Sequence, residues 1–178
     1  QGFPVIQTDR IGHDLLENNA ACRDRILQVF GPEIVGPDQK VSRTALGRKI
    51  FSSPPLRSAL NDILHPLIRA SWTREAARLL ESPGTRAVFV EIPLLFESGA
   101  QSEFHSIITV ACSPDRQISR LRSQRLLSEE EARSRLEAQL SNEQKAARSD
   151  FVIWNEFAPD LLPPQVSLLL EKLGLSVP

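Results

Sequence analysis

The sequence predicts an α/β fold with a mostly parallel sheet flanked by helices. Four short apolar runs, at residues 4–7, 85–91, 106–111 and 151–154, have the composition of strands, and helical patterns separate them. Strands that alternate with helices are typical of a parallel sheet. Residues 87–90, AVFV, are apolar without alternation, so we expect a strand buried on both faces.

The helices are predicted from apolar spacing and from residues that favour helix ends. Asp9 can cap the first helix, Ser42 another, and Ser128 with Glu131 has the form of a capping box. Proline in a helix interior removes a hydrogen bond, so the longest pattern should break or kink at His65-Pro66. The helices are expected at residues 10–17, 20–30, 43–51, 56–81, 116–124, 129–140, 142–148 and 164–173.

Length and composition favour one ordinary globular domain. The 178 residues suffice for a core, and a net charge of −1 gives no overall field for nucleic acid or an acidic membrane. We therefore expect no nucleic-acid and no membrane partner. The sequence has no apolar run of membrane-spanning length and no signal-peptide pattern, which favours a cytoplasmic protein. It predicts no particular oligomeric state.

Two candidate sites lie where predicted strands end, since open α/β sheets bind ligands at the carboxyl ends of their strands. After Glu91 come Pro93, the apolar wall Leu94-Leu95-Phe96 and Glu97, which form either a ligand site or an ordinary loop. Asp9 follows the first strand. Its carboxylate can accept a proton from a hydroxyl nucleophile or help to hold Mg²⁺, or it is only a helix cap.

Residues 120–148 are dense in arginine, glutamate and glutamine and lie between two buried strands. Such a segment is either a solvated surface helix pair or an arginine-bearing lid over a phosphate site. His65 also has two interpretations: it is either a partly buried histidine at a helix kink or a catalytic base. The printed sequence contains no GxGxxG, no GxxxxGK[ST] and no HExxH motif.

Five segments in order resemble the dephospho-CoA kinase family, a branch of the P-loop nucleotide kinases. Each segment alone is weak, but their order and spacing match over nearly the whole chain. They are FPVIQTD at residues 3–9, ALGRKIFSSP at 45–54, LHPLIR at 64–69, EIPLLFESG at 91–99 and LSEEEARSRLEAQ at 127–139.

The resemblance implies a P-loop kinase-like three-layer core with a helical substrate subdomain and a helical lid. It divides the chain into a core (residues 1–16, 84–124 and 149–178), a helical substrate-binding part (17–83) and a lid (125–148). The implied reaction moves the γ-phosphoryl group of ATP, with Mg²⁺, to the ribose 3′-hydroxyl of dephospho-CoA. The partners are therefore ATP and dephospho-CoA.

The resemblance also implies the site residues. Asp9 matches the presumed catalytic base and a possible metal ligand, whereas Gln7 stands where the family usually has another aspartate. Gln124 likewise replaces a usual lid arginine. The CoA part would be held by His13, His65, Pro93, Leu94, Leu95, Phe96 and Glu97. The nucleotide and its phosphates would be held by Arg120, Arg135, Gln139, Arg148 and Asn155.

Family members carry a strand and a GGxGSGKS loop ahead of the position of Gln1. The resemblance therefore predicts roughly 20–30 further residues, the length of a β-loop-α unit, with that strand between the ones at 87–91 and 106–111. Two rival interpretations stay open. One is another P-loop kinase for nucleosides or nucleotides, and the other is a catalytically dead scaffold that binds CoA or nucleotides.

Overall fold

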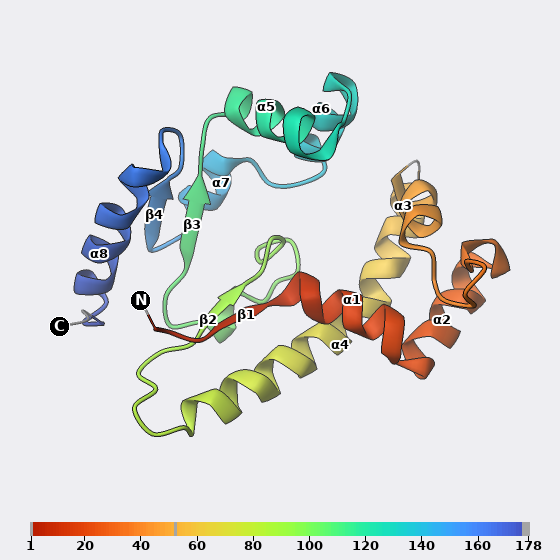
Figure 1. Cartoon of the computed structure of the whole chain (residues 1–178), viewed down its shortest axis with the longest axis horizontal. Coiled ribbons are helices and arrows are strands. Elements are labelled where there is room, and N and C mark those ends of the chain that lie inside the picture. Colours follow the sequence, from red (N-terminus) through yellow and green to blue (C-terminus); the bar gives the residue numbers. More distant parts are fainter. Residues whose placement is uncertain (1, 52, 176–178) are drawn as a thin grey trace. The chain divides into compact units, whose positions relative to one another are not determined.

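The structure, a computed structural model, describes residues 2–51 and 53–175. Ser52, which belongs to the motif at residues 45–54, lies outside the described residues, as do Gln1 and residues 176–178. The chain divides into two compact units, Gln1–Ile92 and Pro93–Pro178, each with its own parallel strand pair. Figure 1 shows the first unit in red to green and the second in green to blue.

The first unit packs a helical core beside one strand pair. β1 and β2 pair in parallel with Ile6 opposite Val90 and Gln7 opposite Glu91. The elements in chain order are β1 (Val5–Gln7), α1 (Thr8–Asn18), α2 (Ala20–Phe30), the 3₁₀ helix η1 (Pro32–Ile34), α3 (Arg43–Phe51), α4 (Pro54–Leu80) and β2 (Phe89–Glu91).

The core of this unit lies among α1, α2, α3 and the long helix α4. Ile26, Phe30 and Ile34 are 0–2% exposed and form its centre. Asn19 fixes the α1–α2 corner, because its side chain accepts a hydrogen bond from the Cys22 amide at 2.8 Å. Gly12 brings α1 close to α4, since a Cβ there would lie 3.4 Å from Ile68 Cδ1.

The second unit holds the other strand pair and the remaining helices. β3 and β4 pair in parallel with Ile108 opposite Phe151 and Ala111 opposite Trp154. Side chains cap its helices, with Ser113 before α5 and, as expected, a complete capping box at Ser128 before α6. The elements are η2 (Gln101–Glu103), β3 (Ile108–Ala111), α5 (Pro114–Arg125), α6 (Glu129–Glu137), α7 (Asn142–Ala146), β4 (Phe151–Trp154), η3 (Pro159–Leu161) and α8 (Leu162–Lys172).

One expectation about the helices is wrong, and another is wrong in part. Asp9 does not cap α1, because the helix already begins at Thr8 and its cap position is Gln7. The Thr8 hydroxyl donates to the Glu91 carbonyl at 2.9 Å and so fixes this residue to β2, and α1 begins two residues earlier than predicted. At His65-Pro66 a break or a kink was expected; the break is absent, since α4 continues through Pro66, and the kink stays a prediction. Packing of α1, α2 and α3 against α4 holds this helix despite the bond that proline removes.

The strands β1, β3 and β4 are covered on one face. Phe89 and Val90 are only half-buried, contrary to the expected strand with two buried faces. Ile6 is buried while Val5 is 60% exposed, and in β3 the buried residues alternate with Val110, which is 59% exposed. This alternation is typical of strands with one covered face. No helix in the described part of the chain has the length and apolar character needed to cross a membrane.

Candidate active site

The end of β1 carries Asp9 beside a small polar cluster. Gln7 Nε2 donates to Glu91 Oε2 at 3.1 Å, across the parallel pair. Thr8 is buried against the Glu91 carbonyl, so the following residue is held at the carboxyl end of both strands. Asp9 is exposed there in the first turn of α1. A carboxylate at this place is stabilised by the helix N-terminus and is open to substrate.

Gln7 changes the charge at this edge. Where the family usually has an aspartate, this chain has an amide that donates to Glu91. Two carboxylates at that distance would repel each other, whereas the Gln7 amide donates a hydrogen bond to Glu91. Asp9 and Glu91 are thus the two carboxylates at the β1–β2 edge.

His13 and His65 lie on the two helices that meet at Gly12. His13 follows Gly12 on α1, and His65 lies one helical turn before Ile68, the residue that Gly12 faces on α4. Both histidines are half-buried. They belong to the first unit, as does Asp9, so the structure places these three predicted residues on neighbouring elements of one unit.

The apolar wall Leu94-Leu95-Phe96 lies in a turn rather than in a strand or helix. The Ser98 amide donates to the Leu94 carbonyl at 2.9 Å, and the Ser98 hydroxyl donates to the Leu95 carbonyl at 3.0 Å. Gly99 closes the turn at a φ of +69°, which favours glycine. The three wall side chains stay half-buried, so the turn presents apolar surface without hiding it.

Lys145 ties this turn to the region between α6 and α7. Its Nζ lies 3.2 Å from the Pro93 carbonyl, 3.3 Å from Gln139 Oε1 and 3.4 Å from Glu97 Oε1. Glu97 Oε1 also accepts the Leu140 amide at 2.9 Å. The Lys145 and Glu97 side chains are only 15% and 21% exposed, which makes the pair stronger than an open surface pair.

Arg148 approaches the same turn from the other side of α7. Its guanidinium carbon lies 6.0 Å from the centre of the Phe96 ring, a cation–π distance. The second unit therefore brings Pro93, Phe96 and Glu97 together with Gln139 and Arg148. The resemblance implies that Pro93, Phe96 and Glu97 bind the acceptor substrate. It implies that Gln139 and Arg148 bind the nucleotide.

Arg120 and Asn155 meet at the ends of β3 and β4. Arg120 Nη2 donates to Asn155 Oδ1 at 3.2 Å, and its Nη1 lies 3.7 Å from Cys112 Sγ. The Asn155 amide donates to the Ala111 carbonyl at 2.7 Å, extending the strand pair by one residue. Burial raises the pKa of the Cys112 thiol, although the nearby Arg120 charge opposes that shift. The guanidinium of Arg120 is thus held at the strand ends by Asn155 and Cys112.

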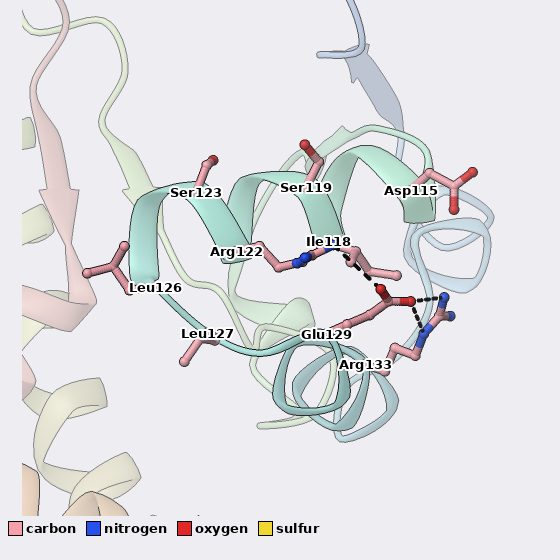
Figure 2. Close-up of a pocket in the computed structure, with 9 residues that line it drawn as sticks. All are labelled: Asp115, Ile118, Ser119, Arg122, Ser123, Leu126, Leu127, Glu129 and Arg133. Carbon is pink, nitrogen blue, oxygen red and sulfur yellow. Dashed lines mark hydrogen bonds and ion pairs between the residues drawn. The ribbon is translucent and has the colours of Figure 1, made fainter.

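Between α5 and α6 lies a cavity of about 580 Å³, shown in Figure 2. The Glu129 carboxylate lies between two arginines there, 2.8 Å from Arg133 Nη2 and 3.5 Å from Arg122 Nη1. The hydrogen bond from Arg133 and the two positive charges hold the pKa of Glu129 below its usual value. Arg122 on α5 and Arg133 on α6 are therefore both engaged with Glu129, whereas Arg135 is exposed on α6.

The described residues contain no group of three or more His, Cys, Asp or Glu that could hold a metal ion by itself. A closed, all-protein metal cage is therefore not formed by this part of the chain. Mg²⁺ in kinases is commonly held by one or two carboxylates together with substrate phosphates and water. An exposed Asp9 beside Glu91 is compatible with that second arrangement.

Some contacts of this region are not given by any sequence pattern. The resemblance gives Lys145 only a matching position in the lid segment, whereas the structure shows it bound to Pro93, Glu97 and Gln139. Glu156 binds Ser113, from which it is 43 residues distant. No periodicity or motif within one segment carries information on such a pair.

Comparisons with known proteins agree with this geometry. A family model described as dephospho-CoA kinase matches residues 1–159. The dephospho-CoA kinase of Bdellovibrio bacteriovorus is 36% identical over 171 residues, with 96% of this chain and 84% of that protein covered. That of Anaeromyxobacter dehalogenans is 35% identical, with 97% and 82% covered.

Solved structures give the same result. A Thermus thermophilus crystal structure superposes with a TM-score of 0.78 at 32% identity, covering 97% of this chain and 85% of that one. The dephospho-CoA kinase of Campylobacter jejuni superposes with a TM-score of 0.68 at 29% identity, with 97% and 85% covered.

Proposed function

The chain belongs to the dephospho-CoA kinase family, and from that premise we propose a role for each residue of its site. The chain is an ATP-dependent kinase that phosphorylates dephospho-CoA to coenzyme A, the last step of coenzyme A biosynthesis. The phosphoryl group passes from the γ position of ATP to the ribose 3′-hydroxyl. The rival interpretation as a nucleoside or nucleotide kinase is thereby replaced.

Asp9 is the catalytic base in this proposal, and its position carries the proposal. Its carboxylate is exposed at the carboxyl ends of β1 and β2, next to a buried and hydrogen-bonded Thr8. As the 3′-oxygen of the acceptor bonds to the γ-phosphorus, the bond from that phosphorus to the β–γ bridging oxygen breaks and ADP leaves. The hydroxyl proton passes to an Asp9 oxygen.

Mg²⁺ accompanies ATP in this proposal, with Asp9 as a ligand. A single exposed carboxylate fits a site that substrate phosphates complete, and the neighbouring Glu91 adds negative charge at the same strand edge. When bound, the ion would neutralise charge on the phosphate oxygens. Gln7 contributes by holding Glu91 in place through its amide.

The acceptor is held by His13 and His65 and by the turn that begins at Pro93. The half-buried wall Leu94-Leu95-Phe96 offers apolar contact to the CoA part, and Glu97 is fixed by Lys145 and the Leu140 amide. Because Glu97 has these partners, we assign it to shaping the wall together with Pro93. The half-buried histidine rings supply hydrogen-bonding groups.

The nucleotide is held by Arg120 and Asn155 and by the lid residues Arg135, Gln139 and Arg148. The bond from Arg120 to Asn155 supports this role, because it fixes a forked donor at the strand ends. Lys145 orients Gln139, and Phe96 orients Arg148. The division into core (1–16, 84–124 and 149–178), substrate part (17–83) and lid (125–148) belongs to the same proposal. So does a cytoplasmic location, where we expect coenzyme A to be made.

Replacing Arg135 tests the nucleotide role directly. Arg135→Ala should lower kcat/KM for ATP by about 10–100-fold, less than the loss of a full arginine finger, because one phosphate-directed cation is removed. The exposed side chain leaves no cavity, so the melting temperature should stay unchanged. Steady-state kinetics measure the effect, with Arg133→Ala on the same helix as the control. An unchanged kcat/KM would contradict this role and show that Arg135 is only a solvated surface residue.

The scaffold alternative predicts binding without chemistry. Gln7 and Gln124 depart from the family pattern and are the sequence features that favour it. A titration with dephospho-CoA, followed by an ATP turnover assay on the same sample, separates the two. The proposal predicts both binding and turnover. Binding alone would favour the scaffold.

A further inference from the structure

The start of α5 is held by a carboxylate from a distant part of the chain. Glu156 Oε2 accepts the Ser113 amide at 2.7 Å, and Glu156 Oε1 accepts the Ser113 hydroxyl at 2.9 Å. The same hydroxyl oxygen accepts the Arg116 amide at 3.2 Å and so caps the helix. Both bonds from Ser113 hold the pKa of Glu156 below its usual value.

This arrangement completes a capping box with a residue that lies outside the helix. At α6, Ser128 finds its acceptor in Glu131, three residues on, and at α7, Ser141 finds it in Gln144. At α5 the equivalent residue is Arg116, which has no acceptor atom. Glu156 takes the place of that acceptor. A box within one helix holds only that helix, whereas this one joins α5 to the segment after β4.

The joined segment contains Asn155, the partner of Arg120. Arg120 lies two turns into α5, and its fork reaches Asn155 Oδ1 at 3.2 Å and Cys112 Sγ at 3.7 Å. Glu156 is the next residue after Asn155, and Ser113 is the next after Cys112. One end of α5 is therefore fixed to the strand ends by Glu156, and the Arg120 side chain meets the same strand ends.

We propose that Glu156 is a positioning residue for the nucleotide: through Ser113 it holds α5 against the end of β4, so that the Arg120 fork stays in register with Asn155. The proposal rests on the nucleotide role proposed above for Arg120 and Asn155. Glu156 itself touches no substrate. It acts by keeping a phosphate-directed guanidinium from swinging away on a loosened helix.

The surroundings of Glu156 make its substitution a clean test. Glu156 lines a cavity of about 630 Å³, as do Arg116, Phe157 and Asp160. Because this cavity is open to solvent, truncation creates no buried void. Asp160 lies in the same segment and forms no bond with Ser113 among the described residues, so Asp160→Asn is a matched change of charge.

The experiment compares Glu156→Ala, Glu156→Gln and Asp160→Asn in the full-length enzyme, with ATP and dephospho-CoA. We expect Glu156→Ala to raise KM for ATP about tenfold while kcat changes less than about threefold, since the lost bond positions a binding group. KM for dephospho-CoA should stay unchanged. Glu156→Gln should recover part of the loss, because its amide oxygen can still accept the Ser113 amide. Asp160→Asn should match the parent enzyme.

Arg120→Ala and the double variant separate the two proposals. If Glu156 acts through Arg120, Arg120→Ala raises KM for ATP and adding Glu156→Ala raises it no further. If Arg120→Ala leaves KM for ATP unchanged, the proposed nucleotide role of Arg120 is wrong. The positioning role of Glu156 is then wrong as well, because it depends on Arg120. If Arg120→Ala raises KM but Glu156→Ala lowers only the melting temperature, Glu156 is merely structural and this inference alone is overturned.

Discussion

Asp9→Asn is expected to reduce kcat by about 10²–10⁴-fold, the usual contribution of a general base. Asparagine has nearly the same shape as aspartate but cannot take the proton of the acceptor hydroxyl. Asp9 is exposed at the β1–β2 edge, so the substitution disturbs no packing. Loss of a negative charge from the first turn of α1 should cost only about 0.3–1 kcal/mol of stability.

The measurement pairs turnover with binding. Dephospho-CoA should bind Asp9→Asn with nearly the parent Kd in a calorimetric titration, while ADP release falls. Glu17→Gln, an exposed change of the same kind on the same helix, serves as the control and should keep full activity. If Asp9→Asn retains the turnover of the parent enzyme, Asp9 is not the catalytic base.

Phe30→Ala is expected to lower the free energy of unfolding by about 3–5 kcal/mol. Phe30 is 2% exposed at the end of α2 and packs at the centre of the core of the first unit. Truncation removes a large apolar surface and leaves a cavity that α1, α3 and α4 cannot easily close. A loss of this size is a large part of the ~5–15 kcal/mol that stabilises a whole domain.

Val29→Ala is the matched control, because Val29 precedes Phe30 on the same helix and is 47% exposed. Urea unfolding followed by circular dichroism gives both free energies. Val29→Ala should change the free energy by well under 1 kcal/mol. If Phe30→Ala cost no more than Val29→Ala, the helical core described for the first unit would not be the one that stabilises it.

The features that could be predicted from sequence are those that neighbouring residues determine. The Ser128–Glu131 capping box marks a helix start correctly, since a cap and its helix are adjacent in the chain. The strand ends that carry Asp9 and Asn155 were found for the same reason. The α/β class followed from the alternation of these elements.

The features that could not be predicted depend on contacts between distant segments. The start of α1 moved to Thr8 because its hydroxyl binds the Glu91 carbonyl, 83 residues away. The helix through Pro66 continues because three other helices pack on α4. Likewise the bonds of Glu97 to Lys145 and of Ser113 to Glu156 join segments more than 40 residues apart. These contacts decide which carboxylates are free for substrate and which hold the fold.

The most direct test of the kinase assignment is an ADP-release assay on the full-length protein with ATP and Mg²⁺. Dephospho-CoA, adenosine and AMP are compared as acceptors, with a sample lacking any acceptor as the blank. We predict ADP release with dephospho-CoA far above the blank, and little with adenosine or AMP, with coenzyme A as the product. A folded protein that binds dephospho-CoA but releases no ADP, or one that prefers adenosine or AMP, would contradict the account.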